Sequence, residues 1–341
     1  MRTDSINTWL AGLATAALLL ACDGAGDGSD GGEIDAPPLP PIDTSAVTVS
    51  GISSGAAMAQ QLHLAYGDRF SGAGLVAGVP YGCAEGELSL ALGRCLGQAE
   101  ALPVERFLAA LEDGAARGQA SDPALLAGHR VWMFHGTKDE AVGRAATDAA
   151  AAVYAAHVPD ARRRYVTDVP AAHHFPTLDA GNPCDTSAEP WLGACDYDAA
   201  GELLSFLYPG LAAPGAADRG ADPGEGLREV TLPGADDAGL EKTAWLFVPA
   251  QCPAEGCRLH LALHGCAMSV AKNGMAFIEE SGYLPWARAN GIVLAFPQVD
   301  TALLNPLGCW DWWGYSSDDY LDRDGVQMKA LADWVAGLAG G

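Results

Sequence analysis

The first feature of this sequence that could do chemistry is a serine between small residues. Ser53 is the middle residue of Gly51-Ile-Ser-Ser-Gly55, which follows the β-branched run 46–50 and precedes a helix-like stretch at 56–66. A G-x-S-x-G sequence between a strand and a helix is typical of a nucleophile elbow, because small neighbours let the backbone bend sharply and leave the serine hydroxyl exposed. The sequence therefore predicts that Ser53 is a nucleophile.

A serine hydroxyl is a poor nucleophile until a base takes its proton, and that base has to be oriented by a third group. Asp139 fits the third role because it comes just after the strand-like run 130–134. In α/β enzymes with this chemistry, the acid follows the nucleophile in the chain and precedes the histidine. Asp168 is less suitable, since it is too close in sequence to the candidate bases. An alternative role for Asp139 is the N-cap of a helix.

Two adjacent histidines, His173 and His174, are the candidates for the base. They follow the strand-like run 164–167 and complete the chain order of serine, acid and histidine. Adjacent side chains rarely face the same site, so the two histidines compete for this role. His135 follows another predicted strand and is assigned no role.

Acyl transfer also requires two amide donors for the oxygen that becomes negative, and removing one such donor typically slows a reaction by about 10²–10³. The residue after the nucleophile supplies one amide, which here is Ser54. The other usually comes from a loop after an earlier strand, often with a His-Gly sequence. No such segment precedes Ser53, but Leu263-His-Gly-Cys266 follows the strand-like run 259–263.

The elements that have to position these residues are those of an α/β fold. In the N-terminal half, strand-like and helix-like segments alternate, which is typical of a mostly parallel sheet with helices on both faces. They lie at 46–50, 56–66, 74–78, 104–116, 130–134, 145–156 and 164–167. The C-terminal half has two hairpin-like strands, two buried strands and a terminal amphipathic helix, at 228–232, 243–249, 259–263, 292–296 and 324–339.

The position of the His-Gly segment is explained if the chain is circularly permuted. With the C-terminal half placed first, the segments follow the order of the α/β-hydrolase fold. In the actual chain, this order is cut just before the nucleophile strand. Such rearrangement is tolerated where the original termini are close together on the surface. The Pro/Gly-rich stretch 209–226 would join the old ends as a surface connection. Residues 46–340 are therefore predicted to form a single catalytic domain.

The N-terminus predicts export. Arg2 precedes an apolar run, 10–21, which is too short to span a bilayer but long enough for the core of a signal peptide. The run ends in Leu19-Leu-Ala-Cys22, which resembles the lipobox of bacterial lipoproteins, whose cysteine carries lipid. Residues 23–45 are rich in Gly, Asp and Pro and are predicted to be a tether. We expect a lipoprotein anchored at Cys22 and facing the periplasm or the exterior, or otherwise a secreted protein.

Charge and cysteine content narrow the class of protein further. The chain has 43 acidic and 19 basic residues, a net charge of −24 that makes nucleic acid an unsuitable partner. Apart from Cys22 there are eight cysteines, an even number that suggests disulfides in an exported protein. Close spacing favours the pairs 83–95, 184–195 and 252–257, which leaves 266 and 309 by elimination. The absence of a CxxC pair argues against a zinc site.

Five segments in this order resemble the polyhydroxybutyrate (PHB) depolymerases, and in particular their circularly permuted, single-domain branch. The segments, which together span about 46–340, are Ser50-Gly-Ile-Ser-Ser-Gly-Ala-Ala-Met-Ala59, His135-Gly-Thr-Lys-Asp139 with Val142, His173-His-Phe-Pro176, Leu263-His-Gly-Cys266 and Gly308-Cys-Trp-Asp-Trp-Trp-Gly-Tyr315. The family often has a glycine where this chain has Pro170. Secreted members often carry a further polymer-binding domain, which is not recognisable here.

The resemblance implies roles for these residues. Ser53 would be the nucleophile, Asp139 the acid and His173 the base, since the family places its histidine two residues before Phe-Pro. The backbone amides of Ser54 and Cys266 would form the oxyanion hole. Three tryptophans would line the site of the polyester chain, whose methyl and methylene groups indole can cover: Trp310, Trp312 and Trp313. The family implies no metal or organic cofactor and no obligate protein partner.

Three functions are consistent with these features. The favoured one is a serine esterase that hydrolyses poly(3-hydroxybutyrate) or its oligomers through an acyl-enzyme. A feruloyl or acetylxylan esterase would share the fold and the Ser/Asp/His set, although the Cys-Trp-Asp-Trp-Trp segment favours the polyester. A surface lipoprotein that binds polyester or carbohydrate without turnover would not need a nucleophile elbow.

Overall fold

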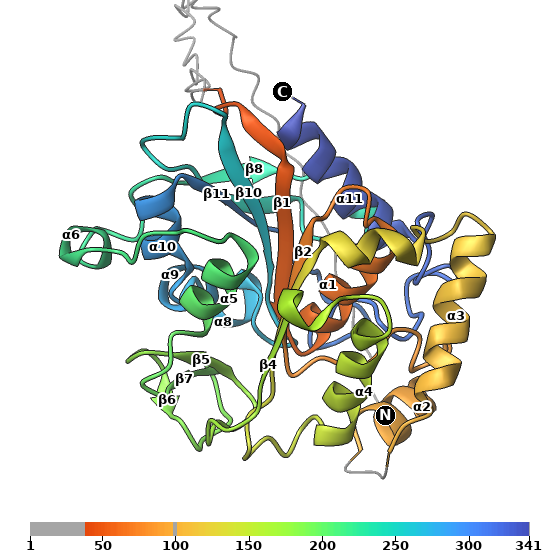
Figure 1. The fold of residues 1–341 in the computed structure, drawn as a ribbon. Helices are drawn as coiled ribbons and strands as arrows, with labels where there is room; N and C mark the ends of the chain where they lie inside the picture. Colours follow the sequence, from red (N-terminus) through yellow and green to blue (C-terminus); the bar gives the residue numbers. More distant parts are fainter. Residues whose placement is uncertain (1–37, 98–100, 341) are drawn as a thin grey trace, which may run out of the picture. The chain divides into compact units, whose positions relative to one another are not determined.

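An eight-stranded sheet connects the two halves of the chain in the computed structural model, which describes residues 38–97 and 101–340 (Figure 1). The strand order is β4-β3-β2-β1-β10-β11-β9-β8. The strands are β1 (Ile42–Ile52), β2 (Gly72–Val76), β3 (Arg130–Phe134), β4 (Arg163–Val166), β8 (Leu227–Thr231), β9 (Thr243–Phe247), β10 (Cys257–Leu263) and β11 (Ile292–Phe296). β9 pairs antiparallel with β11 and β8 with β9, whereas the other neighbours are parallel.

The strand order confirms the predicted circular permutation. If the strands are renumbered so that β8–β11 become 1–4 and β1–β4 become 5–8, their order across the sheet is 1-2-4-3-5-6-7-8. This arrangement places β1, from the N-terminal half, directly beside β10, from the C-terminal half, with Gly51 opposite Leu263. The nucleophile strand and the strand before the His-Gly segment therefore end at the same edge of the sheet.

Helices cover both faces of the sheet (Figure 1). One face carries α1 (Ser54–Ala65), α3 (Val104–Ala116), α4 (Arg144–Ala155) and α11 (Val326–Ala339); the other carries α5 (Ala199–Leu207) and α10 (Tyr283–Asn290). The remaining short helices are α2 (Leu88–Leu90), α6 (Ala216–Arg219), α7 (Ala235–Ala238), α8 (Val270–Asn273) and α9 (Ala276–Glu280), with single turns of other helix types at Ala91–Cys95, Pro123–Gly128 and Asp160–Arg162. A small sheet, β5-β7-β6, follows the histidine pair and consists of Phe175–Thr177, Leu192–Ala194 and Asn182–Pro183.

The central strands are apolar because both of their faces are covered. All five residues of β11 are buried, as are all five of β2. A strand that is buried on both sides has no solvent face to mark with polar residues, so it is a continuous apolar run without alternation. The strand predicted at 292–296 agrees with the structure to the residue, whereas the strand predicted at 74–78 lies two residues earlier, at Gly72–Val76.

The largest difference from the predicted elements is at β1. The strand begins at Ile42 and not at residue 46, and Ile42 pairs with Cys257 across an irregularity in the register. The last four residues of the predicted tether 23–45 thus belong to the sheet. The rest of the tether up to residue 37, the predicted signal peptide 1–22 and Cys22 lie outside the described residues. The connection 209–226 contains only the short helix α6 and joins α5 to β8.

All four predicted disulfides are present: Cys83–Cys95, Cys184–Cys195, Cys252–Cys257 and Cys266–Cys309. Disulfides of this number are typical of proteins that fold in an oxidising compartment, which agrees with export from the cytosol. Among residues 38–97 and 101–340, none of the helices combines the length and the apolar character that crossing a bilayer requires.

We predict that the chain can be returned to the unpermuted order. Ala339 and Gly340 line one cavity together with Thr44 and Val47, so the end of α11 is near the start of β1. In the rearranged chain, a short Gly/Ser linker joins Gly340 to Leu39, and the new N- and C-termini are made by one cut within 209–226. Every strand then keeps its present neighbours. We expect cooperative thermal unfolding with a midpoint changed by less than about 10 °C. A matched chain opened inside β10 should not fold, and equal behaviour of the two would contradict the prediction.

Candidate active site

Ser53 lies in a strained turn between β1 and α1. Its backbone has φ 57° and ψ −120°, in a region that residues with a side chain rarely adopt. Its amide donates to the carbonyl of Val76 at 2.9 Å, which ties the turn to the neighbouring strand β2. This is the geometry of a nucleophile elbow, with the serine at the end of a strand and at the start of a helix.

The two glycines of the motif allow the turn to pack closely. A Cβ atom on Gly51 would lie 2.4 Å from the carbonyl carbon of Gly55, and a Cβ on Gly55 would lie 2.3 Å from the carbonyl oxygen of His264. Neither distance is possible for real atoms. The spacing of the motif therefore reflects two contacts, one within the elbow and one with the His-Gly segment after β10.

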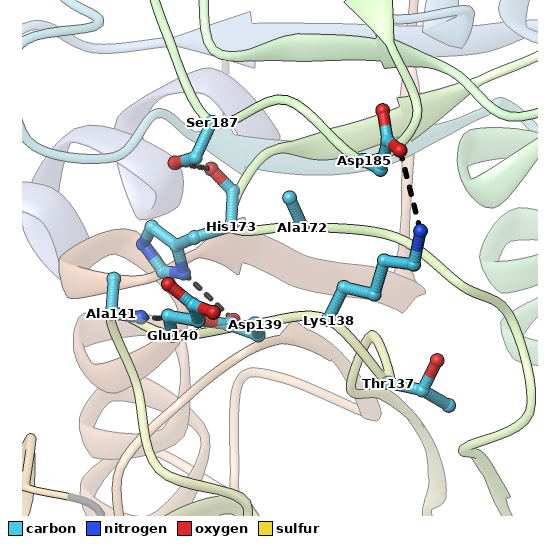
Figure 2. Close-up of a pocket in the computed structure, with 9 residues that line it drawn as sticks. All are labelled: Thr137, Lys138, Asp139, Glu140, Ala141, Ala172, His173, Asp185 and Ser187. Carbon is cyan, nitrogen blue, oxygen red and sulfur yellow. Dashed lines mark hydrogen bonds and ion pairs between the residues drawn. The ribbon is translucent and has the colours of Figure 1, made fainter.

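His173 connects Ser53 to Asp139. Its Nε2 lies 3.1 Å from the hydroxyl oxygen of Ser53, and its Nδ1 lies 2.8 Å from a carboxylate oxygen of Asp139. An ionised carboxylate can only accept, so Nδ1 carries the proton and Nε2 is the acceptor that faces the serine. The hydroxyl of Ser187 donates to the backbone carbonyl of His173 at 2.8 Å and holds the loop in place (Figure 2).

The carboxylate of Asp139 is buried and held on both oxygens. Its side chain is 1% exposed. The oxygen that does not face His173 accepts hydrogen bonds from the amides of Ala141 and Val142, both at 2.9 Å. Burial acts to raise the pKa of Asp139, but the hydrogen bond from His173, the electrostatic interaction with that ring and the amide of Val142 outweigh it and hold the pKa below its usual value. The alternative role of Asp139 as a helix N-cap is wrong, because Gly143 is at the N-cap of α4 and Asp139 instead accepts from the amides of the turn before that helix.

The structure separates the two histidines that the sequence left in competition. His174 is 1% exposed, and its Nε2 lies 2.7 Å from the carbonyl oxygen of Cys184. A Cβ on Gly193 would lie 2.0 Å from its ring, so this imidazole is packed against the small sheet. Burial lowers its pKa. His174 therefore has a structural role. Asp168, the other candidate acid, is exposed, and Nδ1 of His173 is already bonded to Asp139.

The predicted amide donors lie at the end of β1 and after β10. Ser54 is the first residue of α1, and its amide has no carbonyl one helical turn earlier within the helix. Cys266 lines the same cavity as Ser53 and His173. Because this helix end carries a partial positive charge, the edge of the cavity favours an anion.

The segment that carries Cys266 is fixed by several contacts. The indole N–H of Trp310 donates to the carbonyl of His264 at 2.9 Å, and a disulfide joins Cys266 to Cys309. The amide of Val299 donates to Nε2 of His264 at 3.3 Å, which places the ring proton on Nδ1, 2.7 Å from the carbonyl of Gly265. Burial lowers the pKa of His264 to about 4, so the ring is neutral at pH 7.

Two cavities meet at His173. The first, of about 360 Å³, is mostly apolar and is lined by Ile52, Ser53, Ala141, His173, Ser187, Trp191, Gly265, Cys266, Ala267, Met268 and Leu307. The second is larger, about 850 Å³, and is mostly polar (Figure 2). They have Ala141, His173 and Ser187 in common, so the imidazole stands between an apolar and a polar space.

The three tryptophans predicted to line the substrate site are buried. Trp310 is 0% exposed, and its indole donates to the backbone of the His-Gly segment, which corrects its expected role from substrate contact to support of the loop. Trp312 and Trp313 are 7% and 8% exposed and pack edge to face on each other. Neither is among the residues that line the two cavities. Their contact with substrate stays a prediction.

Sequence reasoning missed the residues that form the apolar wall of the first cavity. Trp191, Met268 and Leu307 come from three separate loops. The loop that ends at Leu307 also carries Leu303 and Leu304, which are 96% and 71% exposed. The run Ala-Leu-Leu-Asn-Pro-Leu at 302–307 was the one visible signal, because exposed leucines in a polar, Pro-containing loop often mark a binding surface.

A metal ligand set is not formed within the described part of the chain. His174, Cys184 and Cys195 offer three ligand atoms within 4.8 Å of one another. The two sulfurs are bonded to each other, so neither can supply the thiolate that a metal needs. The cluster is a disulfide packed beside a histidine.

Comparison with known proteins identifies the relatives of this chain, although no family model matches it. A poly(3-hydroxybutyrate) depolymerase of Delftia acidovorans is 38% identical over 307 residues, which are 88% of this chain and 61% of the relative. A polyhydroxybutyrate depolymerase of Talaromyces funiculosus is 32% identical over 317 residues, which are 88% of this chain and 91% of the relative. The chain thus spans about three fifths of the bacterial relative and nearly all of the fungal one.

Solved structures agree with the sequence comparison. A PHB depolymerase complexed with an R3HB trimer has a TM-score of 0.82 and 31% identity, and the match covers 89% of this chain and 98% of that one. The PHB depolymerase from Penicillium funiculosum has a TM-score of 0.81 and 32% identity over the same shares. With this identity across nearly the whole fungal relative, and with the same fold, the chain belongs to the polyhydroxybutyrate depolymerase family.

Proposed function

We propose that this protein is a serine esterase that hydrolyses ester bonds of poly(3-hydroxybutyrate) or of its oligomers. Ser53 is the nucleophile, His173 the general base and Asp139 the group that orients the base. The observation that carries the proposal is the continuous line of contacts from the Ser53 hydroxyl through His173 to Asp139, at 3.1 and 2.8 Å. The Ser53 end of this line of contacts faces a mostly apolar cavity.

The proposed reaction is a double displacement. Nε2 of His173 accepts the proton of Ser53 while the serine oxygen attacks the ester carbonyl. The amides of Ser54 and Cys266 stabilise the negative oxygen of the tetrahedral intermediate. As the intermediate collapses, the imidazolium gives its proton to the departing alcohol, and an acyl-enzyme remains. His173 then takes a proton from water, whose oxygen attacks the acyl carbon. As this second intermediate collapses, the imidazolium returns the proton to the oxygen of Ser53, and a carboxylic acid is released.

Asp139 contributes by remaining ionised throughout the cycle. Its pKa lies below the usual value, so the carboxylate stays negative at neutral pH. A fixed negative charge 2.8 Å from Nδ1 stabilises the imidazolium that forms after each proton transfer and keeps the imidazole in the tautomer that accepts at Nε2.

The chemistry of the cavity and the names of the relatives support a hydroxyalkanoate polyester as substrate. Trp191, Met268 and Leu307 present apolar surface beside Ser53, which suits the methyl and methylene groups of the chain. Leu303 and Leu304 come shortly before Leu307 in the same loop and are exposed. Relatives over 88% of this chain are named for hydrolysis of the same polymer, and one solved relative holds an R3HB trimer.

A comparison of substrates tests the proposed function. Purified protein and its Ser53→Ala variant are incubated with amorphous polyhydroxybutyrate granules and with feruloylated arabinoxylan. We expect the wild type to clear the granules and the variant to lose this activity, because no hydroxyl remains to form the acyl-enzyme. Release of ferulate without clearing would indicate a cell-wall esterase, and binding without turnover would indicate a binding lipoprotein.

Replacement of the proposed acid tests the role of Asp139. Asp139→Asn keeps the size of the side chain but removes the charge and favours the wrong imidazole tautomer, so kcat should fall by up to about 10⁴. Circular dichroism and thermal unfolding show whether the variant still folds. Asp168→Asn, in the other candidate acid, should retain nearly normal kcat. Near-normal activity of a folded Asp139→Asn variant would remove Asp139 from the mechanism.

We further infer that the protein is exported and anchored by lipid at Cys22. The support is the Leu-Leu-Ala-Cys sequence at the end of the apolar run and the flexible composition that follows it. In a bacterial host, the wild type should partition with membranes and Cys22→Ser should not, as measured by immunoblotting of membrane and soluble fractions. Equal partitioning of the two would disprove the anchor.

A further inference from the structure

The polar cavity beside His173 contains charged residues that the double displacement does not use. It is lined by Thr137, Lys138, Asp139, Glu140, Ala141, Ala172, His173, Asp185 and Ser187 (Figure 2). Lys138 is the one lysine or arginine among the described residues that line either cavity, against the acidic Glu140 and Asp185 as well as the proposed acid. The lining is therefore net negative, in a chain whose net charge is −24.

Lys138 is neutralised by a specific partner. Its Nζ lies 3.3 Å from a carboxylate oxygen of Asp185, and both side chains are more than half exposed. An exposed pair of this kind contributes little to stability and is easily exchanged for water or for another anion. The pair therefore matters more for the field that it creates in the cavity than for the free energy of unfolding.

Backbone contacts fix the two ends of this pair. The amide of Lys138 donates to the carbonyl of Ala171 at 3.1 Å, and the amide of Ala172 donates to the carbonyl of Cys184 at 2.8 Å. Asp185 directly follows Cys184, which is bonded to Cys195. Lys138 and Asp185 are thus held on opposite sides of the segment that leads into His173. A single charge change at either residue alters the cavity without displacing the loop that carries the imidazole.

The charge of this cavity matters because ester hydrolysis creates carboxylates. Each cleavage of a hydroxyalkanoate ester yields one alcohol and one carboxylic acid, and an acid with a pKa near 4 is an anion at neutral pH. An interior ester of the polymer carries no charge, whereas a short oligomer ends in a free carboxylate. His173 gives its proton to the departing alcohol. A carboxylate close to that alcohol would therefore meet the charges that line the cavity beside His173.

We propose that Lys138 and Asp185 determine the charge preference of the enzyme. Asp185 masks Lys138, so the negative lining favours a neutral ester chain and disfavours one that ends in a carboxylate near the cleaved bond. The same repulsion promotes release of the anionic product. The inference rests on the proposed polyester hydrolysis and adds to it a substrate class, neutral ester chains, and two residues that select it.

Cleavage of two trimers tests the proposal. One is the 3-hydroxybutyrate trimer with its free carboxylate, and the other is the same trimer capped as an N-methyl amide, which has no charge. Chromatography gives kcat/KM for ester cleavage in each. We expect the wild type to prefer the capped trimer at low salt, and the preference to narrow at higher salt because of screening. Asp185→Asn should raise kcat/KM for the free acid by about three- to tenfold and leave the capped trimer unchanged. Lys138→Gln should lower kcat/KM for the free acid.

A matched pair elsewhere on the surface supplies the control. Asp236 is paired with Lys242 at 2.9 Å, is exposed and lines neither cavity, so Asp236→Asn removes the same charge at another place. An equal effect of Asp185→Asn and Asp236→Asn, or a wild type that does not distinguish the trimers, would overturn the inference. A wild type that cleaves neither trimer would also overturn the inference, whereas the proposed polyester hydrolysis is refuted only if the amorphous granules remain uncleared as well.

Discussion

The parallel pairing of β1 with β10 is the interaction on which the site depends. Gly51 is opposite Leu263, so the serine elbow and the His264 segment leave the sheet side by side although about 210 residues separate them in the chain. Parallel strands end at the same edge of a sheet, which is where α/β folds gather their chemistry. The absent side chain of Gly55 allows the closest approach, since a Cβ there would overlap the carbonyl oxygen of His264.

A buried polar network holds the register of this pairing. The hydroxyl of Ser50 lies 2.7 Å from both Nε2 of His260 and the hydroxyl of Tyr283. The hydroxyl of Thr48 lies 2.7 Å from Nδ1 of His260 and 2.6 Å from the hydroxyl of Tyr208. Burial lowers the pKa of His260 to about 3, so its ring is neutral and serves as both donor and acceptor between the two strands. A shift of one residue would leave these groups unpaired in the core, which is costly. The elbow therefore rests on a strand whose position is specified by hydrogen bonds as well as by packing.

The sequence predicted what motifs and periodicity encode, and missed what depends on contacts between loops. The sheet and the positions of Ser53 and Asp139 follow from apolar runs and from residues at strand ends. The choice between His173 and His174 could not be made from spacing, because it depends on a carbonyl and a glycine in a later loop that receive the second ring. Composition likewise could not show that Trp310 supports the His-Gly segment from within the core, since a buried donor and a substrate platform are both tryptophans in sequence.

Two disulfides constrain the loops that complete the site. Cys184–Cys195 closes the loop that receives His174, and Cys266–Cys309 joins the proposed oxyanion segment to the loop that carries Trp310. In addition to the burial of side chains such as Trp310, a disulfide restricts the conformations that these loops can adopt when unfolded. The apolar wall of the cavity and the proposed second amide donor lie on these bridged loops. These bridged loops agree with the oxidising environment that the N-terminal sequence predicts.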